Sequence, residues 1–140
     1  MLSFEYFIKE KIVKKTFTNK SLARSLVKSS KDRFEFAIKI IDMKPRYALE
    51  NAYEVIIELI DALLAINGYK SWSHEANISF LIKFKKFSSV ELERLDNIRR
   101  KRHSSKYYGV FFETEEVKRE IEFLKSIDKK LRTIIDVMLK

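Results

Sequence analysis

Six basic or potentially basic side chains lie within eight positions of one another in the stretch LDNIRRKRHSSKYYG, residues 95–109. Like charges at such spacing repel, so a cluster of this kind is typical of a surface that binds an anion, and phosphate is the commonest one. Arginine can hold phosphate through two parallel hydrogen bonds. The alternative is a solvated helix face in a lysine-rich protein. The residues predicted to contact nucleic acid are Arg99, Arg100, Lys101, Arg102 and Lys106, with His103 inside the same cluster.

Helical register singles out Arg102 within this cluster. Leu95 and Ile98 lie on the apolar side of the predicted helix, and Arg102, seven residues after Leu95, falls on the same stripe. We therefore expect its side chain to point toward the core or toward a partner. Two interpretations stay open, a functional contact or an intramolecular salt bridge, for instance to the acidic strip that contains Glu50 and Glu54.

Length and composition indicate one folded domain over residues 1–140, with a net charge of +9 from 29 basic and 20 acidic residues. The absence of cysteine excludes disulfides and thiolate metal sites, and the two histidines are too far apart for a metal-binding motif. We expect no metal and no cofactor. Lack of cysteine also fits a cytoplasmic protein. The lack of glutamine, with abundant Ile, Lys and Glu, suggests a heat-adapted source.

No apolar run reaches membrane-spanning length, since the longest, near residues 55–66, contains Glu58 and Asp61. The first fifteen residues alternate aromatic and basic side chains, which suits either a membrane surface or a packed amphipathic helix. We favour the packed helix and expect no membrane partner.

Two glycines and one proline in 140 residues leave little turn chemistry for many short strands. The sequence therefore predicts an all-α fold, an antiparallel up-and-down bundle of four to five long helices plus a short N-terminal helix. The expected helices cover residues 3–15, 20–42, 46–67, 73–86, 88–109 and 114 to nearly the C-terminus.

Local signals mark several of these boundaries. Pro45 suits the first turn of a helix, and the pair Asn67-Gly68 suits a left-handed cap at its end. Ser73 is a candidate N-cap, as is Ser88 or its neighbour Ser89. The last of these signals, Ser88 or Ser89, predicts where the basic helix starts.

The last helix carries an apolar repeat at positions 117, 121, 124, 131, 135 and 138. This heptad spacing suits a dimer seam or packing within the chain, and we expect a homodimer. Asp128 interrupts the repeat, and the favoured explanation is a helix end that places it in solvent.

Two segments together resemble the HEPN family (higher eukaryotes and prokaryotes nucleotide-binding domains). Residues 48–81, ALENAYEVIIELIDALLAINGYKSWSHEANISFL, resemble the family's central helix, its Gly-Tyr-Lys turn and a Ser-His-Glu-Ala start to the next helix. The basic stretch resembles the family's signature of an arginine, a polar residue and a later histidine, with Arg102 and His103 as the first pair. The resemblance implies a single HEPN-like helical domain.

Active family members resemble metal-independent ribonucleases, and the signature histidine would fall at Tyr107, Tyr108 or Gly109. A phenol of ordinary pKa, about 10, is a poor general base, whereas histidine changes protonation near neutrality. The candidate catalytic residues implied by the resemblance are Arg102, His103 and Tyr107, although the substituted signature suits binding better than cleavage.

These observations favour a module associated with nucleic acid or nucleotide. The resemblance further implies a minimal nucleotidyltransferase as partner, in a toxin–antitoxin-type pair. Two alternatives stay open: a metal-independent ribonuclease that uses Arg102 with His103 or Tyr107, and a protein-binding module with a basic docking face.

Overall fold

The computed structural model describes the backbone of residues 1–108 and 112–140 and the side chains of residues 1–103 and 112–140. Helices dominate this part of the chain, as the sequence predicts, and one small sheet is also present. In chain order the elements are α1 (Phe4–Lys9), β1 (Val13–Lys15), α2 (Lys20–Lys39), α3 (Pro45–Ile66), β2 (Tyr69–Ser71), α4 (His74–Phe80), the 3-10 helix η1 (Leu81–Lys83), α5 (Ser89–Tyr108) and α6 (Thr114–Leu139).

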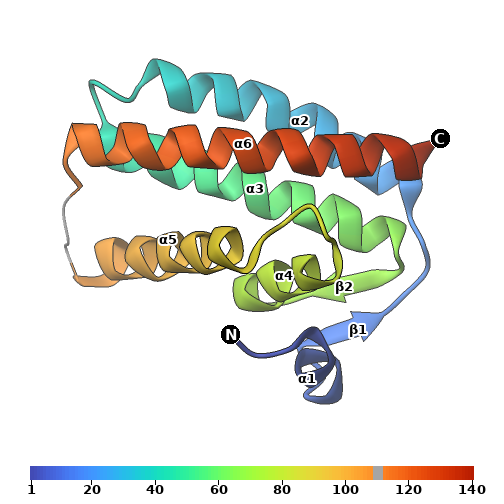
Figure 1. Cartoon of the computed structure of the whole chain (residues 1–140). Coiled ribbons are helices and arrows are strands. Elements are labelled where there is room, and N and C mark those ends of the chain that lie inside the picture. The colour runs from blue at the N-terminus through green and yellow to red at the C-terminus, as the bar shows by residue number, and fades with distance from the viewer. Residues whose placement is uncertain (109–111) are drawn as a thin grey trace.

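Helix α3 lies at the centre of the molecule. It packs against α2 and α6 on one side and against α4 and α5 on the other, and the chain direction alternates along α2, α3, α5 and α6 (Figure 1). Thirteen of its 22 residues are buried. A helix that is apolar over most of its circumference is stable in water only when neighbours cover it, so the composition of α3 dictates its central place.

The helix boundaries follow local sequence signals. Pro45 is the first residue of α3, and Gly68 adopts a φ of +79° directly after its end, as a left-handed cap requires. The Ser73 hydroxyl accepts the Ala76 N–H at 3.2 Å at the start of α4. These three predicted boundaries are confirmed.

A capping box opens α5. Ser88 Oγ accepts the Glu91 N–H at 3.1 Å, and Glu91 Oε1 accepts the Ser88 N–H at 2.9 Å. Two donors at the helix start are satisfied in this way, so the start of the basic helix is fixed by its own sequence.

The small sheet was not expected. β1 pairs antiparallel with β2, with Lys14 opposite Lys70, and the predicted N-terminal helix over residues 3–15 ends at Lys9. Lys11 then takes a φ of +61°, which turns the chain into β1. Pairing with a strand more than fifty residues away satisfies the backbone groups of this segment, and such a partner is not visible in a local pattern. The fourth helix also ends early, at Phe80.

The apolar stripe of α6 is buried within the chain. Val117, Leu124, Ile127, Leu131 and Ile135 are each fully buried, so the heptad spacing serves the internal core and provides no open dimer seam.

Asp128 lies inside α6, and the expectation of a helix end there is wrong. Its carboxylate pairs with Arg132 Nε at 3.0 Å. Arg132 in turn donates to the Val27 carbonyl and to Ser30 Oγ, at 3.2 Å and 3.0 Å. Asp128 therefore positions an arginine that joins α6 to α2.

Across residues 1–108 and 112–140, none of the helices combines the length and apolarity that crossing a bilayer demands. In the same part of the chain, no three His, Asp or Glu side chains gather as a metal site would need.

Candidate functional site

Helix α5 presents the basic cluster along one flank of α3. Leu95 and Ile98 are fully buried and fix the rotation of α5 about its axis. The cationic side chains therefore leave the helix in different directions. Arg100 has 60% of its side chain exposed, whereas Arg102 has only 19%. Accessibility to a ligand thus differs sharply within the cluster.

Arg102 points inward, as its register predicts, and its described partners lie on α3. Its Nη2 lies 2.6 Å from Glu54 Oε1, and its guanidinium carbon lies 5.3 Å from the ring centroid of Tyr53. Its Nε is buried and has no hydrogen-bond acceptor among the described residues. The internal salt bridge, one of the two interpretations left open by the sequence, is therefore formed.

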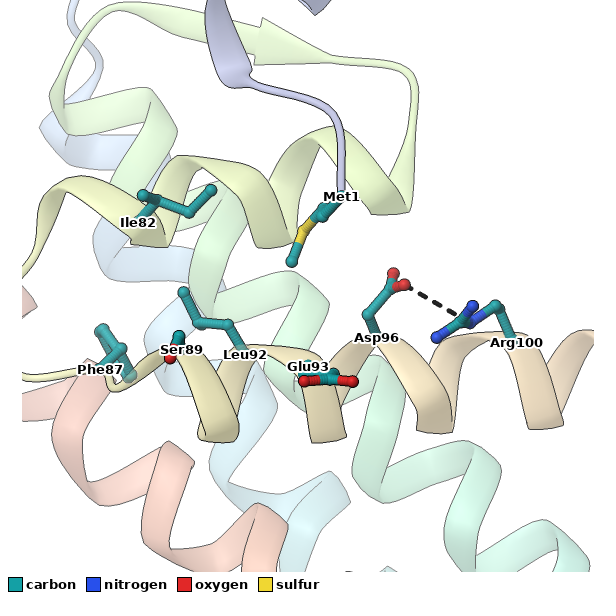
Figure 2. Close-up of a pocket in the computed structure, with 8 residues that line it drawn as sticks. All are labelled: Met1, Ile82, Phe87, Ser89, Leu92, Glu93, Asp96 and Arg100. Carbon is teal, nitrogen blue, oxygen red and sulfur yellow. Dashed lines mark ion pairs between the residues drawn. The ribbon is translucent and has the colours of Figure 1, made fainter.

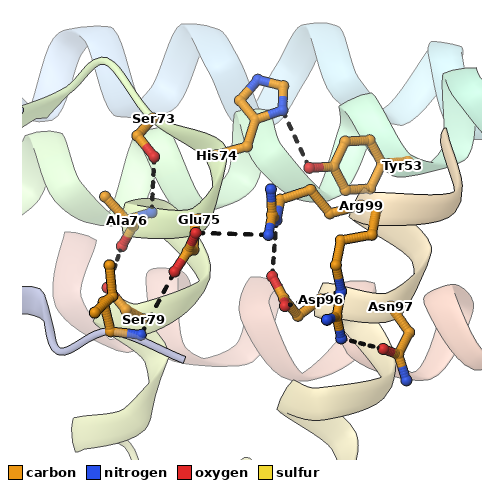
Figure 3. A network of polar contacts seen from close by, with 11 residues as sticks. Tyr53, Ser73, His74, Glu75, Ala76, Ser79, Asp96, Asn97 and Arg99 are labelled. Atoms are coloured by element: carbon orange, nitrogen blue, oxygen red, sulfur yellow. Dashed lines mark hydrogen bonds and ion pairs between the residues drawn. The ribbon is translucent and has the colours of Figure 1, made fainter. Parts of the chain in front are cut away.

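Tyr53 connects Arg102 to α4. The Tyr53 side chain is fully buried, and its hydroxyl lies 3.1 Å from His74 Nδ1 (Figure 3). Burial raises the pKa of Tyr53 above its ordinary value, although the charge of Arg102 opposes this. Tyr53 is therefore a neutral phenol at physiological pH. Its role is to hold Arg102 and His74 in place.

Asp96 is the centre of a second group of polar contacts, which joins α5 to α4 (Figure 3). Asp96 is buried, with 8% of the residue exposed. Its Oδ1 accepts a hydrogen bond from Arg99 Nε at 2.7 Å. Arg99 also reaches Glu75 Oε1 at 3.6 Å, and Arg100 Nε lies 3.5 Å from Asp96 Oδ2. Asp96 thus fixes two arginines of the cluster at once.

Lys101 extends toward α6, where it pairs with Glu116 and lies over the ring of Phe112, 5.7 Å from its centroid. His103 is exposed. The side chains of Lys106 and Tyr107 lie outside the described residues, so the structure does not place them relative to Arg102.

Each described lysine or arginine of the cluster has a carboxylate partner within the chain. Four cations face four carboxylates, those of Glu54, Glu75, Asp96 and Glu116. The expected mutual repulsion is therefore largely compensated, and the cluster does not require an external anion to fold. The more exposed pairs can still exchange a carboxylate for a phosphate, because surface ion pairs contribute little free energy.

A cavity of about 510 Å³ lies beside this cluster, between α5 and the N-terminal segment (Figure 2). This volume falls within the range usual for small-molecule sites. The lining combines apolar and charged side chains: Met1, Ile82, Phe87, Ser89, Leu92, Glu93, Asp96 and Arg100. An apolar wall with two carboxylates and one arginine suits a ligand that has a flat hydrophobic part, hydrogen-bond donors and an anionic group.

Three residues of this site were not predicted from the sequence: Tyr53, Asp96 and Glu75. Tyr53 lies in an apolar run and is indistinguishable there from an ordinary core residue. Asp96 did carry a signal, because it precedes Arg99 and Arg100 by three and four residues, the spacing of helical ion pairs. Glu75 becomes relevant only through the packing of α4 on α5.

No protein-family model matches the sequence, and comparison with curated proteins gives no significant match.

Proposed function

We propose that the chain is a HEPN-like helical module that binds RNA or a nucleotide at the flank of α5. The observation that carries this proposal is the position of Arg100, which is largely exposed and lines the cavity beside the cluster. A phosphate at Arg100 would place an attached nucleoside against Leu92 and Ile82. Asp96 and Glu93 would accept hydrogen bonds from the base or the sugar.

Arg102 has a different role in this proposal. Because it pairs with Glu54 and lies close to the ring of Tyr53, it attaches α5 to α3 and is less free to contact a ligand. The net charge of +9 supports attraction of a polyanion to the molecule as a whole. Arg99 and Lys101 would add phosphate contacts along the backbone of an RNA, without sequence specificity.

A homodimer is part of the proposal, and the turn between α2 and α3 supports it. Four large apolar residues near this turn are exposed. The exposed fraction is 52% for Phe36, 42% for Ile38, 72% for Met43 and 50% for Tyr47. Large apolar side chains left exposed favour burial against a partner. The family resemblance implies a nucleotidyltransferase as a further partner.

Methyl NMR of the whole chain tests the proposed site. Adenosine monophosphate is titrated in, and the methyl groups of Ile82 and Leu92 are followed together with that of Leu63, which is fully buried in α3. We expect saturable shifts at Ile82 and Leu92 and none at Leu63, and we expect Arg100→Gln to weaken the saturation at least several-fold. Shifts that avoid both cavity methyls, or an unaltered affinity in Arg100→Gln, would overturn the proposal.

A further inference from the structure

The outer face of the two-stranded sheet carries a second basic surface, far in sequence from α5. Lys14 of β1 lies directly opposite Lys70 of β2, and both side chains are exposed. Trp72 follows β2 by one residue and shares the face of Lys70, since alternate residues of an extended chain point to the same side. It is 59% exposed, although tryptophan is normally among the more buried residues.

The three side chains form one group. Lys70 Nζ lies 5.0 Å from the centroid of the Trp72 ring and Lys14 Nζ lies 5.7 Å from it. Two like charges directly opposite each other across a sheet destabilise the pair. Within the side chains that the structure describes, neither lysine forms an ion pair with a carboxylate. This contrasts with α5, where the described lysine and arginines are paired.

The charge of the surrounding chain has the same sign. Residues 9–20 contain five lysines and one acidic residue, Glu10. This surface therefore carries positive charge that the fold leaves uncompensated, with a large aromatic ring at its edge.

The backbone that carries Trp72 is held by hydrogen bonds on both sides. The Trp72 N–H donates to the Ile12 carbonyl at 3.0 Å, which extends the ladder of the sheet by one bond. Beyond it, Ser71 Oγ accepts the Ser73 N–H at 3.2 Å and donates to the Ser73 carbonyl at 2.9 Å. Because the backbone of Trp72 is fixed on both sides, stacking of a flat partner on the ring costs little ordering of the main chain.

We propose that this face, which we call the Trp72 surface (Lys14, Lys70 and Trp72), binds single-stranded RNA. One unpaired base stacks on Trp72, and the flanking phosphates replace the indole ring as the partners of the two ammonium groups. An exposed aromatic ring between cations is the combination by which proteins bind single strands with little sequence preference. The inference extends the proposed function, since it names the form of RNA and adds a contact remote from α5.

The chemistry of the face favours RNA over a lipid bilayer. Insertion into a membrane interface draws on several apolar side chains on one face, whereas Trp72 shares this face with two lysines. Stacking also requires a base that is free of its own neighbours, which a single strand offers and a duplex does not.

Trp72 is the only tryptophan of the chain, so its fluorescence reports this surface alone. The full chain is titrated at low salt with oligouridylate, with a duplex RNA of equal length, and with vesicles of phosphatidylcholine and phosphatidylserine. We expect saturable quenching by oligouridylate, much weaker quenching by the duplex, and no blue shift with vesicles.

Variants are compared by the anisotropy of a labelled oligouridylate. Trp72→Leu should weaken binding about tenfold, and Trp72→Phe should restore most of it, because a smaller ring still stacks. The double variant Lys14→Gln/Lys70→Gln should reduce the slope of log K against log salt by about 1.4, that is about 0.7 for each phosphate that a lysine no longer neutralises. The matched control, Lys125→Gln/Lys129→Gln, removes the same charge from two exposed positions of α6 and should leave the slope unchanged.

Several results would overturn the inference. They are equal quenching by duplex RNA, a blue shift with vesicles but no response to oligouridylate, or equal weakening by the control pair. If RNA binds but Trp72→Leu behaves as wild type while Arg100→Gln is impaired, the α5 site stands and the Trp72 surface does not. If wild type binds no RNA at all, the Trp72 surface fails, and the titration with adenosine monophosphate then decides the α5 site as a nucleotide site.

Discussion

Arg102 of α5 and Glu54 of α3 form an ion pair, Nη2 to Oε1 at 2.6 Å, on the side of α3 where Tyr53 is fully buried. The pair explains why a basic residue occupies an apolar stripe. The stem of Arg102 packs toward the core, and its charge is met by a carboxylate one position after Tyr53. The described part of the basic cluster on α5 is thereby attached to the central helix.

Removal of Arg102 should destabilise the fold. Arg102→Ala leaves Glu54 without this cation and removes the guanidinium from the Tyr53 ring, so we expect a loss of about 1–3 kcal/mol in the free energy of unfolding. Urea denaturation followed by circular dichroism measures this. Arg119→Ala is the matched control, because Arg119 is exposed on α6, and it should change stability by less than about 0.5 kcal/mol. Equal stability of the two variants would contradict a structural role for the Arg102–Glu54 pair.

Loss of the Tyr53 hydroxyl should have a smaller effect. Tyr53→Phe keeps the ring in the core but removes the contact with His74 Nδ1, and a hydrogen bond of this kind contributes about 1 kcal/mol. The same substitution at Tyr6, whose residue is 41% exposed, should be close to neutral. If Tyr53→Phe were as stable as wild type in urea, the hydroxyl would not connect α3 to α4 in solution.

Asp61 predicts a specific dependence of stability on pH. Burial raises its pKa from 3.8 to about 6, and this outweighs the hydrogen bond from Asn77 Nδ2 at 2.8 Å; the charges of Glu58 and Glu54 act in the same direction as burial. A carboxyl whose pKa is raised in the folded state favours folding while it is protonated in both states. That contribution is complete below pH about 4 and is lost as pH rises through about 6.

Asp61→Asn should therefore stabilise the protein above pH 6, by up to about 3 kcal/mol for a shift of about two units, and should give no gain near pH 4. The asparagine carbonyl can still accept from Asn77. Thermal denaturation at a series of pH values tests this against Asp32→Asn, an exposed position on α2. A gain in Asp61→Asn that does not vary with pH would show that the carboxyl does not titrate as described.

The apolar surface at the α2–α3 turn should determine the oligomeric state. Met43→Glu combined with Tyr47→Glu places charge on exposed apolar positions and should convert the proposed dimer to a monomer with unchanged helix content. Light scattering after gel filtration measures the mass. Substitution of Val137, which is 65% exposed on α6, serves as the control and should leave the mass unaltered. A monomeric wild type would contradict the homodimer.

The sequence predicts this fold well where the signals are local. Pro45, Gly68 and Ser73 each act through their own backbone conformation or a single nearby hydrogen bond, so they are readable without tertiary context. β1 and β2 are three residues each and pair across more than fifty positions, and no periodicity exists in so short a strand. Their existence depends on packing that the sequence pattern does not express.

In the candidate site too, some features are predicted by the local sequence and others depend on tertiary packing. The register of Arg102 predicts that it points inward, because the apolar stripe defines which side of α5 faces the core. Its pairing with Glu54 depends on the position of α5 along the axis of α3, and the packing of the assembled core sets that position. The cavity beside Arg100 likewise depends on the N-terminal segment, because Met1 forms part of its lining.

The most direct test of the account is RNA binding at low salt by wild type, Arg100→Gln, and the control Lys125→Gln, with the same samples examined for cleavage. We predict binding that weakens as salt rises, a loss of at least several-fold in Arg100→Gln, no loss in the control, and intact RNA throughout. Cleavage that disappears in Arg102→Ala and His103→Ala would instead identify a ribonuclease. No binding by wild type would contradict the account and leave the basic face to a protein partner.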